Sequence, residues 1–156
     1  QPRPTFRVIA LRRDQTLLTL SSLNMLYAQG FLANIFTILA KHKISVDTIT
    51  TSEVSVALTL DKMGSASSGT GLLSQELIDE LSQFCTVKVD TGLSLVALIG
   101  NELHTASGVA KRIFETLDAY NIRMISYGAS TNNICLLADS DKADDIVCLL
   151  HKALFE

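Results

Sequence analysis

Two carboxylates stand beside apolar, strand-like residues and are the side chains best suited to bind a ligand. Asp47 follows Val46, and Glu53 precedes the alternating run Val54–Leu60. Placing a carboxylate in such surroundings is costly unless it meets a cation. These residues predict a site for a positively charged group, and the alternative is that Asp47 is a strand residue facing solvent.

A glycine at the start of a predicted helix is suited to bind the opposite charge. Gly30 precedes Phe31, Leu32 and further apolar residues at helical spacing up to Leu39, a pattern that predicts an amphipathic helix. The backbone N–H groups of Gly30, Phe31 and Leu32 would open this helix, where unpaired donors and the helix dipole favour an anion. The alternative is that Gly30 is only a turn residue.

The remaining reactive side chains form no catalytic or metal-binding pattern. The histidines lack such spacing and are expected at the surface or at helix ends: His42, His104 and His151. The cysteines are odd in number and set among apolar neighbours, so we expect buried, reduced thiols of a cytosolic protein: Cys85, Cys135 and Cys148. The segment Gly64–Gly71 lacks the lysine of a phosphate-binding loop and is expected to be a connector. We therefore predict no catalytic residue and no metal site.

The composition excludes several classes of protein. The chain has 156 residues, of which 47% are hydrophobic, and 13 basic against 16 acidic side chains give a net charge of −3. This balance argues against disorder and against binding to nucleic acid. No apolar stretch approaches the ~20 residues of a membrane span, and arginines interrupt the first apolar run, which argues against a signal peptide. We expect a cytoplasmic globular protein.

The chain contains an internal repeat with an offset of 78 residues. The shift superimposes Gly30 on Gly108, Ile35 on Ile113, Phe36 on Phe114, Leu39 on Leu117, Ile44 on Ile122, Val46 on Met124, Val56 on Ile134 and Leu58 on Leu136. The two carboxylates are not repeated, because Ile125 takes the place of Asp47 and Thr131 takes that of Glu53. Two copies of one supersecondary unit are predicted, and only the first has the carboxylates.

Each copy has the order strand, helix, strand, strand, helix, strand. In the first copy we predict strands at 16–20, 46–50, 54–60 and 86–90 and helices around 32–39 and 77–84. In the second copy we predict strands at 95–99, 123–127 and 133–138 and helices around 109–117 and 146–154. The fourth strand of the second copy is missing, and the N-terminal run Phe6–Leu11 would complete its sheet.

This order predicts an α+β fold of two ferredoxin-like βαββαβ domains, each with helices on one face of a four-stranded antiparallel sheet. The first domain, residues 15–91, would be inserted in a second domain made of residues 1–14 and 92–156. Four stretches carry a resemblance to a known family: Ser21–Leu26, Gly30–Ala33, Ile44–Val56 and Ile122–Ser130. Together they resemble the paired ACT domains of lysine-sensitive aspartate kinases. In that family the first ACT domain is inserted in the second, which agrees with the strand count.

The resemblance implies a regulatory module rather than an enzyme. The aspartate kinase domain, which binds ATP and aspartate, would lie before Gln1, and none of its Lys- and Gly-rich phosphate-binding motif occurs here. Because the chain begins without a methionine, we expect a fragment or a processed product. We expect no kinase activity and no cofactor in this chain, with ATP and Mg²⁺ bound only by the missing domain.

The resemblance also implies that L-lysine, as an allosteric inhibitor, binds between the first ACT domains of two subunits of a homodimer. The matching positions are Met25, Phe31, Leu32, Val46, Asp47, Ser52 and Glu53, to which we add Gly30, Ser45 and Thr51. Asp47 is expected to bind the ε-ammonium group, and the helix start at Gly30 to bind the α-carboxylate. Oxygens of Ser45, Thr51, Ser52 and Glu53 would accept from the ammonium groups, while Met25 and Val46 would line the aliphatic stem. The second copy, without the carboxylates, is expected to bind no lysine.

Other function classes fit less well. An RNA-binding module with this strand order needs exposed aromatic residues on its central strands, whereas 16–20 and 95–99 are aliphatic. A stand-alone enzyme needs a constellation of histidine, cysteine or carboxylate side chains, and none is evident. The remaining alternative is that the ACT pair belongs to another amino-acid-regulated protein.

Overall fold

The computed structural model describes residues 6–22, 30–52, 54–61, 73–101, 103, 108–127 and 132–155. The chain divides into two compact units. The first unit comprises Gln15–Thr91, and the second unit comprises Gln1–Asp14 together with Gly92–Glu156. In the order of the chain, the first unit is therefore an insertion within the second.

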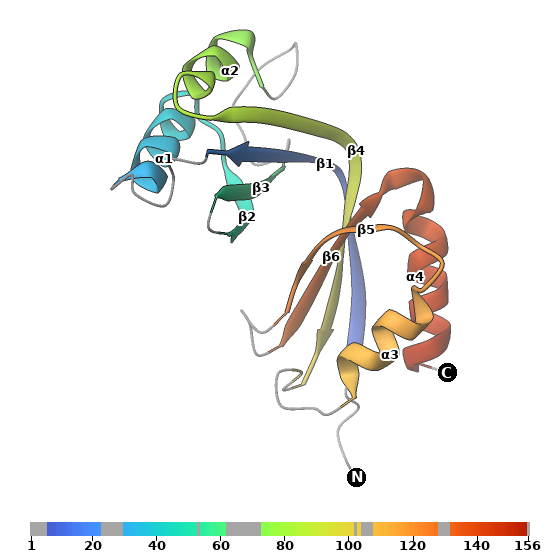
Figure 1. Cartoon of the computed structure of the whole chain (residues 1–156). Coiled ribbons are helices and arrows are strands. Elements are labelled where there is room, and N and C mark those ends of the chain that lie inside the picture. The colour runs from blue at the N-terminus through green and yellow to red at the C-terminus, as the bar shows by residue number, and fades with distance from the viewer. Residues whose placement is uncertain are drawn as a thin grey trace. The chain divides into compact units, whose positions relative to one another are not determined.

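Two long strands contribute residues to both units (Figure 1). β1 spans Phe6–Ser21, and β4 spans Thr86–Gly100. The sequence predicted two separate strands in place of each, because polar residues or glycine interrupt the apolar runs. This prediction was wrong, since each strand continues through the interruption, with left-handed backbone at Asp14 (φ 56°) and Gly92 (φ 70°).

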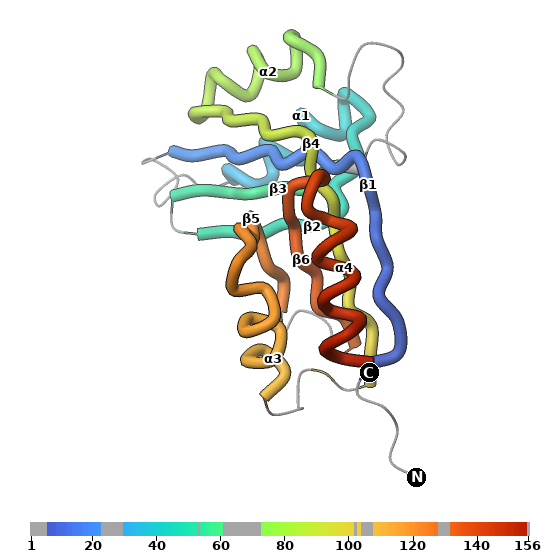
Figure 2. The backbone as a smooth tube through the Cα atoms, turned by 90° about the vertical axis from the view of Figure 1, so that its right-hand side faces the viewer, coloured from blue at the N-terminus to red at the C-terminus, as the bar shows by residue number. Residues whose placement is uncertain are grey.

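The first unit has the strand order β2-β3-β1-β4 (Figure 2). β2 spans Val46–Thr51, β3 spans Ser55–Asp61, α1 spans Phe31–Lys41 and α2 spans Gln75–Ser82. Alternate residues of the strands and one stripe of each helix are apolar, so the helices bury one face of the sheet. The largest side chains of this core are Leu18, Leu20, Ile35, Leu39, Leu58, Leu60, Leu77 and Leu81.

The ends of both helices in the first unit have local causes. Gly30, with a left-handed φ of 78°, precedes α1, and a second left-handed residue, Lys43 (φ 58°), follows it. The N–H groups of Lys43 and Ile44 donate to the carbonyls of Ala40 (3.0 Å) and Leu39 (2.9 Å), which closes the helix end. At the start of α2, the Ser74 hydroxyl accepts from the N–H of Leu77 at 3.2 Å.

The second unit has the strand order β1-β4-β6-β5. α3 spans Val109–Thr116, β5 spans Ile122–Ser126, β6 spans Asn133–Asp139 and α4 spans Ser140–Phe155. Both helices lie on the same side of the strands (Figure 1), and they bury a core that includes Phe6, Val96, Leu98, Ile113, Leu136, Ile146 and Leu150. The predicted α+β fold, with the N-terminal strand completing the second sheet, is confirmed.

Two expectations about individual elements need correction. α4 begins at Ser140, earlier than predicted, and the hydroxyl of this residue lies 2.8 Å from that of buried Ser94. The cysteines are not all buried: Cys148 is exposed, and Cys85 and Cys135 are partly buried. Burial raises the pKa of the Cys85 thiol. No helix in the described ranges is long and apolar enough to cross a membrane.

Candidate functional site

The start of α1 offers backbone donors rather than a capping side chain. Gly30 is exposed, and no side chain caps the helix at this point, so the first N–H groups of α1 have no partner within the helix. The Phe31 ring is buried in the core of the first unit, whereas Leu32 is 38% exposed. Phe31 can therefore contribute its backbone to a site here, and Leu32 can contribute its side chain.

The strand β2 carries the other candidate residues and lies at the end of the strand order. Its register against β3 shifts between Val46 and Thr48, which places Asp47 at the irregularity. The N–H of Thr48 donates to the hydroxyl of buried Thr59 at 2.9 Å, and the two hydroxyls are also hydrogen-bonded. The sequence suggested that the charge of Asp47 would be costly to bury. In the single chain Asp47 is exposed, so its charge is not buried.

Strand directions show which candidates lie together. β2 and β1 are both antiparallel to β3, so they run parallel to each other, and α1 connects them in the opposite direction. The start of α1 and the end of β2 are therefore at one end of the unit, where Gly30, Phe31, Leu32, Thr51 and Ser52 gather. Ser45, Val46 and Asp47 lie towards the other end, because Asp47 is about 13 Å from Thr51 along an extended strand.

The serine that follows β2 is already engaged in a turn. The Ser52 hydroxyl lies 2.7 Å from the hydroxyl of Ser55 and accepts from the N–H of that residue at 3.2 Å. The N–H of Ser52 donates to the carbonyl of Ser55 at 2.8 Å. If the Ser52 hydroxyl binds a ligand, it must do so while it is also bonded within this turn. Thr51 is exposed and is directly opposite Val56 on β3.

A small cavity lies at the same end of the first unit as the start of α1. It has a volume of about 180 Å³ and is lined by Ser21, Ser22, Val54 and Thr86. The N–H of Ser22 donates to the carbonyl of Val54 at 2.8 Å. The sequence contained no signal for Thr86 at this position, because it lies far along the chain and has no distinctive neighbours.

At its other end, α1 is joined to α2 by charged side chains. Lys41 Nζ and His42 Nε2 each lie 3.0 Å from the same oxygen, Oε1 of Glu80. The hydrogen bond from Lys41, followed by that from His42, lowers the pKa of the Glu80 carboxyl. An ionised carboxylate only accepts hydrogen bonds, so Nε2 of His42 donates here.

Some predicted residues lie outside the described ranges. These are Met25, Glu53, the connector Gly64–Gly71 and His104. Of the other histidines, His42 follows the end of α1, and His151 stacks on Phe155 with ring centroids 5.1 Å apart. No group of three or more metal-binding side chains occurs in the part of the chain that the structure describes.

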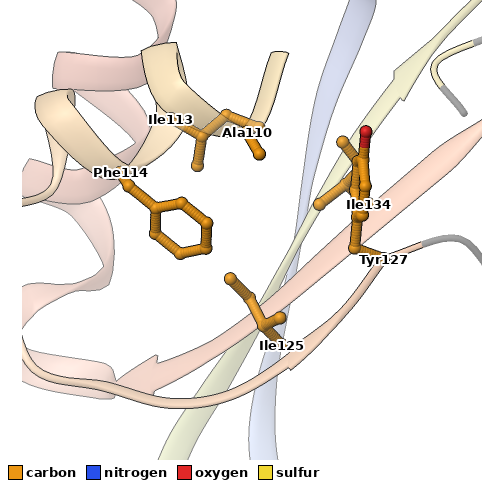
Figure 3. Close-up of a pocket in the computed structure, with 6 residues that line it drawn as sticks. All are labelled: Ala110, Ile113, Phe114, Ile125, Tyr127 and Ile134. Carbon is orange, nitrogen blue, oxygen red and sulfur yellow. The ribbon is translucent and has the colours of Figure 1, made fainter. Parts of the chain in front are cut away.

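The second unit has an apolar pocket of about 160 Å³ that sequence reasoning missed. It is lined by Ala110, Ile113, Phe114, Ile125, Tyr127 and Ile134 (Figure 3). Under the 78-residue repeat Ala110, Ile113, Phe114 and Ile134 match Leu32, Ile35, Phe36 and Val56. On the neighbouring strand the offset is 76 instead, because Ile125 is opposite Leu136 as Ile49 is opposite Leu58. Arg123, and not Ile125 as expected from the sequence, therefore takes the place of Asp47. Gly108 has the same left-handed backbone (φ 77°) as Gly30. The pocket therefore lies among α3, β5 and β6, which correspond to α1, β2 and β3 of the first unit, and its lining contains no carboxylate.

Comparison with known proteins agrees with this arrangement. A family model described as the ACT domain matches residues 96–154, within the second unit. The crystal structure of E. coli aspartokinase III with aspartate and ADP matches the whole chain, with a TM-score of 0.90 and 60% identity, over 35% of its own length. This chain contains an ACT domain. Both units have the ACT fold, so we refer to them as the first and second ACT units.

The ACT pair is also similar in sequence to aspartokinases. It is 61% identical to the lysine-sensitive aspartokinase 3 of Escherichia coli over 98% of the chain and 34% of that protein. A crystal structure of the E. coli enzyme in complex with lysine and aspartate matches all of this chain over 34% of its own length, with a TM-score of 0.88 and 58% identity. The ACT pair thus spans about a third of the length of these relatives and corresponds to their regulatory part.

Proposed function

We propose that this chain is the lysine-sensing part of an aspartate kinase and that L-lysine binds to its first ACT unit. The observation that carries the proposal is the match, over the whole chain, to an aspartokinase crystallised with lysine. In the complete enzyme, lysine would favour one arrangement of the ACT units and so inhibit the kinase part. Such inhibition requires different lysine affinities in two states, typically a coupling of about 1–3 kcal/mol.

The recognition chemistry follows from the two ends of the ligand. The free N–H groups at the start of α1 attract the α-carboxylate, and the neighbouring Thr51 and Ser52 hydroxyls accept from the α-ammonium group. The exposed carboxylate of Asp47 pairs with the ε-ammonium group. This pairing with a charged side chain is what favours lysine over neutral amino acids.

A second copy of the chain brings these two ends together. Within one chain, Asp47 and Thr51 are separated along β2 by more than the length of a lysine. If two β2 strands meet across a two-fold axis near Ile49, Asp47 of each chain lies beside Thr51 of the other, because an isologous interface pairs residue i with j and j with i. The same interface would cover Leu32, Phe36 and Ile49, which are 38%, 39% and 42% exposed. We therefore infer a homodimer through the first ACT unit.

The ligand contact is tested by calorimetric titration of Asp47→Asn with L-lysine. Loss of a charge-assisted hydrogen bond should weaken binding about 10- to 100-fold, while the folded structure is retained. Asp145→Asn, which removes an exposed carboxylate of the second ACT unit, is the matched control and should bind like the wild type. Unchanged affinity in Asp47→Asn would remove Asp47 from the site.

The dimer is tested by the mass in solution of Ile49→Asp. A charge at the proposed two-fold axis should give a monomer that no longer binds lysine, because the site is then incomplete. Tyr127→Asp places the same charge on an apolar residue of the second ACT unit that is 45% exposed, and this variant should remain dimeric. A dimer of Ile49→Asp that binds lysine normally would contradict the proposed interface.

A further inference from the structure

The connection between α1 and β2 is short and fixed at both ends. It consists of residues 42–45, between Lys41 at the end of α1 and Val46 at the start of β2. Backbone hydrogen bonds from Lys43 and Ile44 join it to the last turn of α1. Any movement of this connection is therefore passed on to the first residues of β2, including Asp47.

Within this connection, the His42 side chain reaches another element. Its Nε2 lies 3.0 Å from Glu80 Oε1 on α2, and the two side chains are only 15% and 25% exposed. Lys41, which lies 3.0 Å from the same oxygen, is 64% exposed. A hydrogen bond between two largely covered side chains has a better defined geometry than an exposed ion pair, which contributes little. His42 is thus the more rigid of the two links from α1 to α2.

We propose that His42, held by Glu80, is a positioning residue for lysine recognition that places the start of β2 so that Asp47 meets the ε-ammonium group. This inference rests on the proposed function. His42 does not touch the ligand and acts through the connection it fixes. In the second ACT unit the strand registers place Arg123, which cannot pair with an ammonium group, where the first unit has Asp47.

The test is a double-mutant cycle in lysine affinity, measured by calorimetry on the intact chain. His42→Ala should weaken lysine binding about three- to tenfold, less than loss of the direct Asp47 contact, because His42 acts on the ligand only through the position of β2. His42→Gln, whose amide nitrogen can donate from nearly the same place as Nε2, should restore most of the affinity. In the Asp47→Asn background, His42→Ala should change the affinity less than twofold, because coupled residues do not act additively.

Controls separate positioning from stability. Glu80→Gln keeps the shape of the acceptor and removes its charge, so it tests the link even where His42→Ala unfolds the chain, and it should also weaken lysine binding. Asp144→Asn breaks the exposed 2.7 Å ion pair with Arg13 in the second ACT unit and should leave the affinity unchanged.

The outcomes distinguish the two proposals. If the wild type binds lysine and Asp47→Asn weakens binding, but folded His42→Ala and Glu80→Gln bind like the wild type, the positioning role is wrong and the proposed function stands. Additive effects of His42→Ala and Asp47→Asn would also overturn the positioning role. A wild-type chain that does not bind lysine would overturn both proposals.

Discussion

At the scale of single residues, the candidate site depends on whether each residue offers a side chain or only its backbone. Phe31 has its ring in the core, Ser52 shares its hydroxyl with a turn, and Asp47 presents an exposed carboxylate. The sequence indicated which residue types could bind an amino acid. It could not indicate these competing uses, because the core around Phe31 and the Ser52–Ser55 turn form only when the helix and the strands pack together.

Glu80 gives a prediction about acid stability. Hydrogen bonds from Lys41 and His42 lower its pKa from the ordinary 4.5, so the folded state binds this proton more weakly than the unfolded state. The stabilisation is complete at pH values above the unfolded pKa and is lost as the pH falls through the lowered, folded pKa. Glu80→Gln should therefore be less stable than the wild type at pH 7, and the difference should shrink below about pH 4.5.

Thermal unfolding midpoints of both proteins between pH 7 and pH 3 measure this difference. Asp145→Asn is the control for a carboxylate without these partners and should follow the wild type. A difference between Glu80→Gln and the wild type that stays constant down to pH 3 would show that the Glu80 carboxylate does not prefer its charged form in the fold.

At the scale of elements, the hydrophobic pattern was sufficient to predict the described helices and the four short strands in the right order, but it divided each of the two long strands in two. Alternation along 54–60 and helical spacing after Gly30 are strong local signals. The continuity of β1 and β4 could not be predicted, because Arg12, Arg13 and Asp14 have no apolar alternation. Those residues remain in the strand through hydrogen bonding with neighbouring strands, which local sequence does not record.

The start of α2 gives a prediction at this scale. The Ser74 hydroxyl accepts from the Leu77 N–H at 3.2 Å, which satisfies one of the free donors at the helix start. Ser74→Ala should lower the free energy of unfolding by about 1 kcal/mol, as measured by urea denaturation. Ser74→Asp retains an acceptor at the positive end of the helix and should lose much less. Equal losses in the two variants would mean that the cap is not the cause.

At the scale of the whole molecule, the repeat predicted two similar folding units, and each has its own core. The binding site could be predicted only in part. The 78-residue repeat indicated that the carboxylate belongs to the first unit alone, but the separation of Asp47 from Thr51 along β2 required the strand directions. The apolar pocket of the second unit was missed, because its residues read as ordinary core positions.

The first ACT unit should fold without the second. It has its own core and a complete set of four strands and two helices. A chain of residues 15–91 should therefore show α+β circular dichroism and a cooperative thermal transition, and it should dimerise and bind lysine. An unfolded fragment would mean that the long strands β1 and β4 make the two units a single cooperative structure.

The central claim is that the first ACT unit recognises lysine by its charged side chain. Calorimetric titration of the wild-type chain with L-lysine, beside L-threonine and L-methionine, tests it most directly. We predict saturable binding of lysine, with no more than one site per chain, and no measurable binding of methionine, which lacks the ε-ammonium group. Binding of threonine or methionine in place of lysine, or the absence of binding by all three, would contradict the account.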